Sequence, residues 1–233
     1  MSGASLRVWR ASLLLFAFLS GCISIERSYP ERHYFVLDIG RNEKSIPIAD
    51  QTLNGILEVS DLRISPRYQG QSFVYRISEA GYESDFYNQF LVAPAVLVTE
   101  EVRKALAESR VFAYVINSAS QLPTTHRLEG TVNALYGDFR AGGAGRAVLE
   151  MEFFLTRPSR TGTEIIMDKR YLQSVPLSRR SPEALVKGWD EALQAILTSL
   201  VADLKSAKLQ QEVRSPTPPA AHDKGKSDEA GSR

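Results

Sequence analysis

Apolar and polar positions alternate with a period of two along much of the chain, which is typical of half-buried strands. The pattern is clearest at the centre, where Ala147, Leu149, Met151, Phe153 and Leu155 alternate with Glu150 and Glu152. A second segment places Leu128, Gly130, Val132, Ala134 and Tyr136 on one face. The segments predicted to be strands are 33–39, 57–64, 72–77, 82–90, 111–116, 127–138, 146–156 and 163–172.

Two segments have a helical period instead. The first begins at Pro94 and ends near Ser109, because the next six residues are β-rich. Its apolar stripe is Val98, Val102, Ala105 and Leu106. The second has Ser181 as N-cap, Pro182 in its first turn and Glu183 placed to complement the helix dipole. Its stripe is Leu185, Trp189, Leu193, Ile196, Leu197, Leu200 and Leu204.

These elements predict the α/β class, with one domain over residues 33–208. We expect a mixed, mostly antiparallel sheet with the two main helices packed on it. Gly142–Gly145 and Ser159–Gly162 have the composition of hairpin loops. Residues 209–233 are mainly proline, alanine, serine and mixed charge, so this C-terminal tail is predicted to be disordered.

The N-terminus has the pattern of a lipoprotein signal peptide over residues 1–21. Arg7 and Arg10 precede an apolar run, 11–19, that is shorter than the roughly 20 residues a transmembrane helix needs. Leu19-Ser20-Gly21-Cys22 resembles a bacterial lipobox, in which the cysteine accepts a diacylglycerol group. We therefore expect cleavage before Cys22 and an acylated tether over residues 22–32.

Cys22 is the only cysteine of the chain, so it has no intramolecular disulfide partner. The other interpretation, an ordinary signal peptide followed by an incidental cysteine, leaves that residue unexplained. Two or three acyl chains would hold the protein permanently, since each buried CH₂ contributes about 0.8 kcal/mol. Ile23 follows the cysteine where an aspartate would favour the inner membrane, so the expected location is the outer membrane, on its periplasmic face.

Charge and residue types favour a non-enzymatic protein. Without the signal peptide the net charge is about −1, and no basic stripe predicts nucleic-acid binding. We predict neither a catalytic nor a metal site, because the three histidines are scattered and no nucleophile motif occurs. No cofactor is expected apart from the lipid on Cys22. Glu150 and Glu152 are interpreted as a solvated strand face.

Aromatic residues gather between positions 75 and 90. The candidate partner-binding residues are Tyr82, Phe86, Tyr87 and Phe90. Half-buried sheet packing is the simpler explanation of them. An exposed aromatic surface for a partner protein is the functional alternative, because interfaces are enriched in tyrosine and phenylalanine. The sequence leaves both open.

The whole order of elements resembles that of the ABC-type transport auxiliary lipoprotein component family. The resemblance extends from Tyr34 to Leu204 behind the lipobox. It is carried by Tyr34–Asp38, Leu57–Arg63, Val74–Arg76, Tyr82–Pro94 with the helix that follows, and the hairpins from Leu128 onward.

The resemblance implies an accessory role in lipid transport between bacterial membranes. The implied partners are a periplasmic protein with a mammalian-cell-entry (MCE) domain and the permease and ATPase of an ABC transporter. An assembly lipoprotein, the pilot or plug of an outer-membrane pore, is the alternative. A periplasmic hydrolase is disfavoured by the missing catalytic residues. The cargo is not specified, and a homo-oligomer is left open.

Overall fold

The computed structural model describes residues 31–41, 46–50 and 52–214. A compact unit that begins at Arg32 contains the described helices and strands. The strands are β1 (His33–Phe35), β2 (Leu53–Val59), β3 (Arg63–Ile64), β4 (Ser72–Arg76), β5 (Tyr82–Phe90), β6 (Phe112–Asn117), β7 (His126–Asp138), β8 (Arg146–Ser159) and β9 (Gly162–Pro176). The helices are α2 (Pro94–Ser109) and α3 (Pro182–Arg214), with short 3-10 turns η1 (Ile39–Arg41) and η2 (Pro66–Tyr68).

Within these described ranges the nine strands form one mixed sheet in the order β1-β5-β4-β7-β2-β6, and β8 and β9 extend it from β7. The longest ladders, β7 with β8 and β8 with β9, are antiparallel. The pairings of β1 with β5, β2 with β6 and β7, and β4 with β7 are parallel. The predicted α/β domain with a mixed sheet and two helices is thus confirmed.

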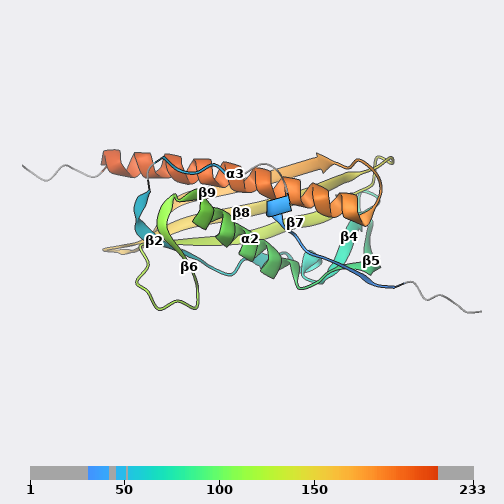
Figure 1. The fold of residues 1–233 in the computed structure, drawn as a ribbon, viewed down its shortest axis with the longest axis horizontal. Coiled ribbons are helices and arrows are strands. Elements are labelled where there is room, and N and C mark those ends of the chain that lie inside the picture. Colours follow the sequence, from blue (N-terminus) through green and yellow to red (C-terminus); the bar gives the residue numbers. More distant parts are fainter. Residues whose placement is uncertain (1–30, 42–45, 51, 215–233) are drawn as a thin grey trace, which may run out of the picture. The chain divides into compact units, whose positions relative to one another are not determined.

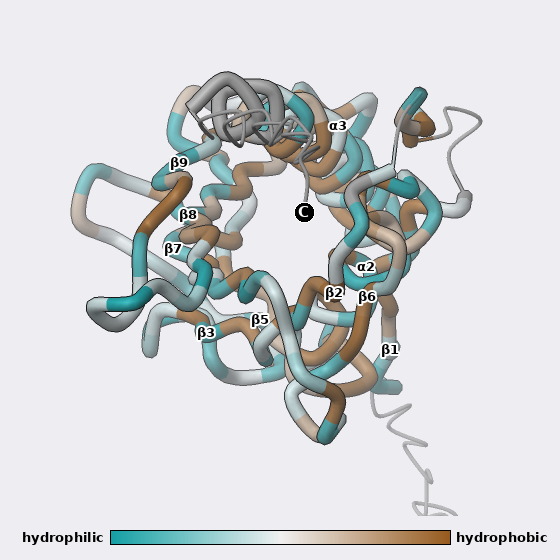
Figure 2. Tube along the Cα trace, turned by 90° about the vertical axis from the view of Figure 1, so that its left-hand side faces the viewer, coloured by the Kyte–Doolittle hydropathy of each residue, from teal (hydrophilic) through white to brown (hydrophobic). Residues whose placement is uncertain are grey.

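Both helices pack their predicted apolar stripes against the sheet. Figure 1 shows α3 running along β8 and β9 with α2 beside it, and Figure 2 shows the helices and the curved sheet arranged around one interior. Trp189 is fully buried there, and its indole nitrogen donates a hydrogen bond of 3.4 Å to the carbonyl oxygen of Tyr136. Ser181 caps α3 as predicted, since its hydroxyl accepts a hydrogen bond from the amide of Ala184.

The segment after β1 differs from the prediction of a strand over residues 33–39. The backbone amides of Asp38 and Ile39 bond to carboxylates of the helices instead of to another strand. The amide of Asp38 donates to Asp190 of α3 at 2.9 Å, and that of Ile39 donates to Glu101 of α2 at 3.0 Å. Buried Leu37 and Ile39 flank these bonds. We call residues 36–41 the docking segment, which crosses from the sheet to both helices (Figure 1).

Two further strand predictions need correction. The predicted strand 57–64 is divided into β2 and β3, because the amide of Leu62 leaves the sheet to bond the hydroxyl of Thr99. In β7 the register slips between Val132 and Ala134. This bulge inverts the alternation, so Tyr136 packs on the outer face of the sheet and not beside Leu128.

Some predictions concern residues that the structure leaves undescribed: the signal peptide, Cys22 and residues 215–233. α3 continues to Arg214, into the first part of the segment predicted as tail. In the described part of the chain, no helix combines the length and apolarity needed to cross a bilayer.

Candidate interaction surface

β5 carries all four residues predicted to bind a partner, and the structure gives them different environments. Phe86 is 60% exposed and Tyr87 41% exposed, whereas Tyr82 is half-buried. Phe90 is only 2% exposed. The four side chains therefore do not form one continuous surface.

Phe90 belongs to the core, so its assignment to a partner surface is wrong. Its ring lies 4.7 Å from that of Phe73 and 5.5 Å from that of Trp189, measured between centroids. Phe35 of β1 completes the cluster at 5.2 Å from Phe73. This aromatic cluster joins β1, β4, β5 and α3, and it supports the exposed residues above it.

A bulge in β5 separates the buried from the exposed aromatic residues. Val74 of β4 pairs with Ser84 and Ser72 pairs with Gln89, so residues 85–88 have no counterpart on β4. Asp85 holds this bulge together. Its carboxylate accepts hydrogen bonds from the amides of Tyr87 and Asn88, from the Asn88 side chain and from the Tyr75 hydroxyl, the last at 2.6 Å. The bulge turns Phe86 and Tyr87 outward while Phe90 points inward.

The pKa values in the bulge reflect these bonds. Burial acts to raise the pKa of Asp85, but the hydrogen bonds from Tyr75 and Asn88 outweigh it and lower the pKa below its usual value. Burial, and then the bond to Asp85, raises the pKa of Tyr75. At neutral pH the pair is therefore a charged carboxylate accepting from a neutral phenol, which fixes the bulge.

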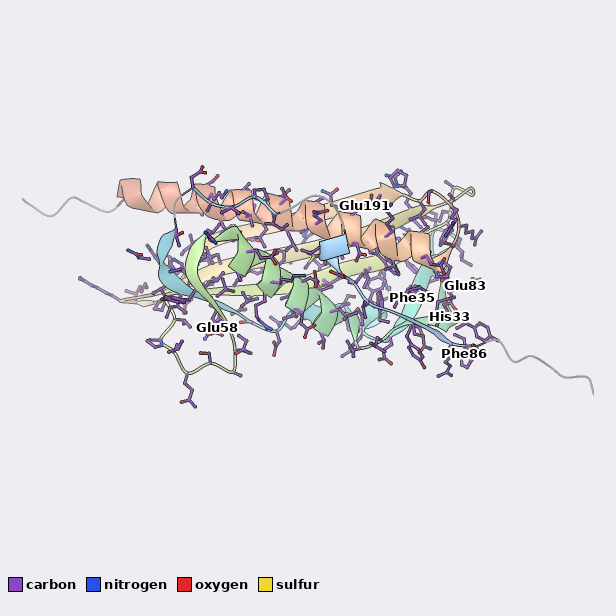
Figure 3. The ribbon with its side chains drawn as sticks, in the orientation of Figure 1. His33, Phe35, Glu58, Glu83, Phe86 and Glu191 are labelled. Carbon is purple, nitrogen blue, oxygen red and sulfur yellow. The ribbon has the colours of Figure 1, made fainter. Side chains whose placement is uncertain are left out.

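The exposed part of β5 continues onto β1 to form what we call the aromatic edge, defined as Tyr34, Phe86, Tyr87 and Leu91. Tyr34 pairs in register with Gln89, and the amide of Leu91 donates to the carbonyl of Phe35 at 2.8 Å. The rings of Phe86 and Tyr87 are 5.2 Å apart, and the guanidinium of Arg32 lies 4.3 Å above the Phe86 ring. In Figure 3, Phe86 lies close to His33, where β1 begins.

Tyr82 lies on the outer face of the sheet in a second group. Its ring lies 6.0 Å from that of Tyr136, which in turn stacks on Tyr68 at 6.1 Å. The guanidinium of Arg67 is 5.2 Å from the Tyr82 ring, a cation–π distance. A depression of about 260 Å³ opens beside it; we call this the Tyr82 groove, lined by Arg67, Gly70, Ser72, Val74, Tyr82, Glu83 and Ser84.

Comparison with known proteins identifies the fold. No family model matches the sequence, and no curated protein matches it. Among solved structures, a DUF330-family protein of Xanthomonas campestris matches with a TM-score of 0.67 and 14% sequence identity, over 78% of this chain and 99% of the other. The domain has a DUF330-like fold. An uncharacterized protein matches with a TM-score of 0.55 and 14% identity, over 76% and 97% of the two chains.

The sequence pattern indicated Phe86 and Tyr87, which are exposed, but gave no sign that Tyr34 and Leu91 lie beside them. Tyr34 was placed in a strand without a surface role, although it stands next to core residue Phe35. Leu91 follows the end of β5, and the pairing of β1 with β5 brings these distant residues together. Tyr136 was missed because the bulge in β7 carries it to the outer face.

Proposed function

We propose that this protein is a non-enzymatic accessory lipoprotein of an ABC/MCE-type intermembrane lipid transport system. It is held by acylated Cys22 at the periplasmic face of the outer membrane, and its domain binds the periplasmic MCE-domain component. The observation that carries the proposal is the family resemblance over Tyr34–Leu204. The two-helix α/β fold over the same residues supports it, because it matches the order of elements on which the resemblance rests.

The Tyr82 groove is the surface that we assign to the MCE-domain protein. It combines an aromatic ring with an arginine, the residue types that most often dominate binding energy at interfaces. The ring of Tyr82 is already held by Tyr136 and Arg67, so little side-chain freedom is lost when a partner binds. The backbone beneath is fixed by the pairing of β4 with β5 and β7.

In-cell photo-cross-linking tests this proposal directly. A photoreactive phenylalanine analogue at position 82 should cross-link the MCE-domain protein, while the same analogue at Tyr114 should not. Tyr114 is 67% exposed on β6, at the opposite end of the sheet order from β1, so it is a more accessible aromatic control far from the groove. Mass spectrometry of the products identifies the partner.

If the analogue at position 82 cross-links a β-barrel or secretin and no transporter component, the pilot or plug function would be favoured instead.

A complementary measurement uses the Arg67→Ala and Tyr82→Ala double variant. It should reduce capture of the MCE-domain protein at least tenfold while the urea midpoint stays near that of Tyr114→Ala.

A further inference from the structure

The aromatic edge lies at the first strand of the domain, directly after the predicted tether. Tyr34 is 54% exposed, and Phe86 and Tyr87 are exposed beside it. Residues 23–31 separate Cys22 from Arg32, and ten residue steps span roughly 35 Å at most when fully extended. Whatever path this segment takes, Arg32, whose guanidinium lies over the Phe86 ring of the aromatic edge, stays within that distance of the acylated cysteine.

We propose that the aromatic edge rests in the headgroup region of the bilayer that holds the acyl chains of Cys22. This inference depends on the lipid anchor of the proposed function and specifies a second contact with the same membrane. Tyrosine is enriched at the membrane–water boundary, because its ring prefers the apolar side and its hydroxyl the wet side. Phe86 and Leu91 add apolar area to the same surface.

Arg32 completes the chemistry of an interfacial site. Its guanidinium lies over the Phe86 ring at 4.3 Å. When this ring enters the headgroup layer, the guanidinium is therefore placed beside the lipid phosphates. Long basic side chains place their charge at this depth while their stems lie along apolar surface. Asp85, the nearest carboxylate on β5, is engaged by Tyr75, Asn88 and the backbone of the bulge.

The bilayer is favoured over a protein as occupant because of the short tether and the position of the edge. An exposed tyrosine also occurs on β6, but β6 is at the other end of the sheet order. The docking segment fixes β1 to both helices through Asp190 and Glu101, so the domain cannot turn freely about its first strand. The aromatic edge contains the first strand after the tether, and this favours it as the membrane contact.

The test uses the mature acylated protein in vesicles of phosphatidylethanolamine and phosphatidylglycerol. Because Cys22 is acylated, a cysteine introduced by Tyr34→Cys or Phe86→Cys is the only free thiol and accepts a fluorophore. Tyr114→Cys and Leu172→Cys are controls at similarly exposed positions on β6 and β9. Lipids with a quencher near the headgroup should quench positions 34 and 86 at least threefold more than positions 114 and 172.

Equal quenching at all four positions, in protein that floats with the vesicles and still captures the MCE-domain protein, would overturn the membrane contact alone. Loss of capture with selective quenching intact would instead contradict the proposed function and leave the membrane contact standing. Protein that does not float with the vesicles would overturn the anchor and both proposals. Urea midpoints of the labelled variants establish that each is folded.

Discussion

Phe86 and Phe90 stand four positions apart on one strand and differ completely in role. In a regular strand both would face the same side, because successive side chains alternate between its two faces. The bulge at Asp85 breaks this alternation. An aspartate whose side chain bonds amides two and three residues ahead is a recognisable turn-forming feature. No local signal, however, shows that β4 would skip these residues.

The contrast between the two phenylalanines can be measured. Phe90→Ala removes a ring from the cluster with Phe73 and Trp189, so it should lower the free energy of unfolding by about 3–5 kcal/mol. Phe86→Ala should change it by only about 0.5 kcal/mol, because the side chain is exposed. Urea unfolding provides both values. Similar midpoints for the two variants would contradict the inward position of Phe90.

At the scale of elements, the sequence predicted both helices and most strands, because helical and strand periods are local properties. α2 and α3 begin at Pro94 and Pro182 as expected, and β5 spans the predicted residues 82–90. The docking segment could not be predicted. Val36, Leu37 and Ile39 make it as apolar as a strand, yet the amides of Asp38 and Ile39 bond to carboxylates that lie far away in the sequence.

The docking segment yields a prediction at Glu101. Glu101→Gln keeps an oxygen that can accept from the amide of Ile39, whereas Glu101→Ala leaves that buried amide without its partner. The alanine variant should lose about 1–3 kcal/mol of stability and the glutamine variant much less. Amide hydrogen exchange should also accelerate over residues 36–41 in the alanine variant, while β8 keeps its protection. Equal exchange in both variants would exclude this role of the carboxylate.

The contribution of Glu101, which accepts from the amide of Ile39, to the stability of the fold depends on pH. Burial raises the pKa of Glu101 in the folded protein. Its contribution to stability is therefore fully present below its unfolded pKa and is lost as the pH rises through the folded pKa. The stability of the wild type relative to Glu101→Gln should accordingly be greatest in acid and decline towards neutral pH. A flat difference in urea midpoint between pH 4 and pH 7 would contradict this.

At the scale of the whole molecule, the order of the strands in the sheet could not be predicted from the sequence. Adjacent hairpins such as β8 with β9 follow from short loops, but β1 with β5 and β2 with β6 are parallel pairs that must be joined by long connections. Their choice depends on which apolar faces fit together in the finished core. For this reason the aromatic edge, which two distant segments share, became visible only in the structure.

Acid should destabilise the molecule in a step that begins near neutrality. Burial, together with the charge of Arg157, lowers the pKa of His126 below its usual value of about 6.5. The folded protein therefore keeps this imidazole neutral at a pH where the unfolded chain is already protonated. The contribution of the neutral imidazole to stability is fully present above about pH 6.5 and is lost as the pH falls through the folded pKa of His126. The urea midpoint should follow this course, and His126→Gln should remove the step.

The bond between the amide of Asp38 and Asp190 joins residues 152 positions apart. Synthesis proceeds from the N-terminus, so the partner in α3 emerges long after the docking segment. The docking segment thus reaches its native position only once α3 is in place. A chain interrupted before α3 would be left unfinished, with the inner face of its sheet uncovered and open to proteases.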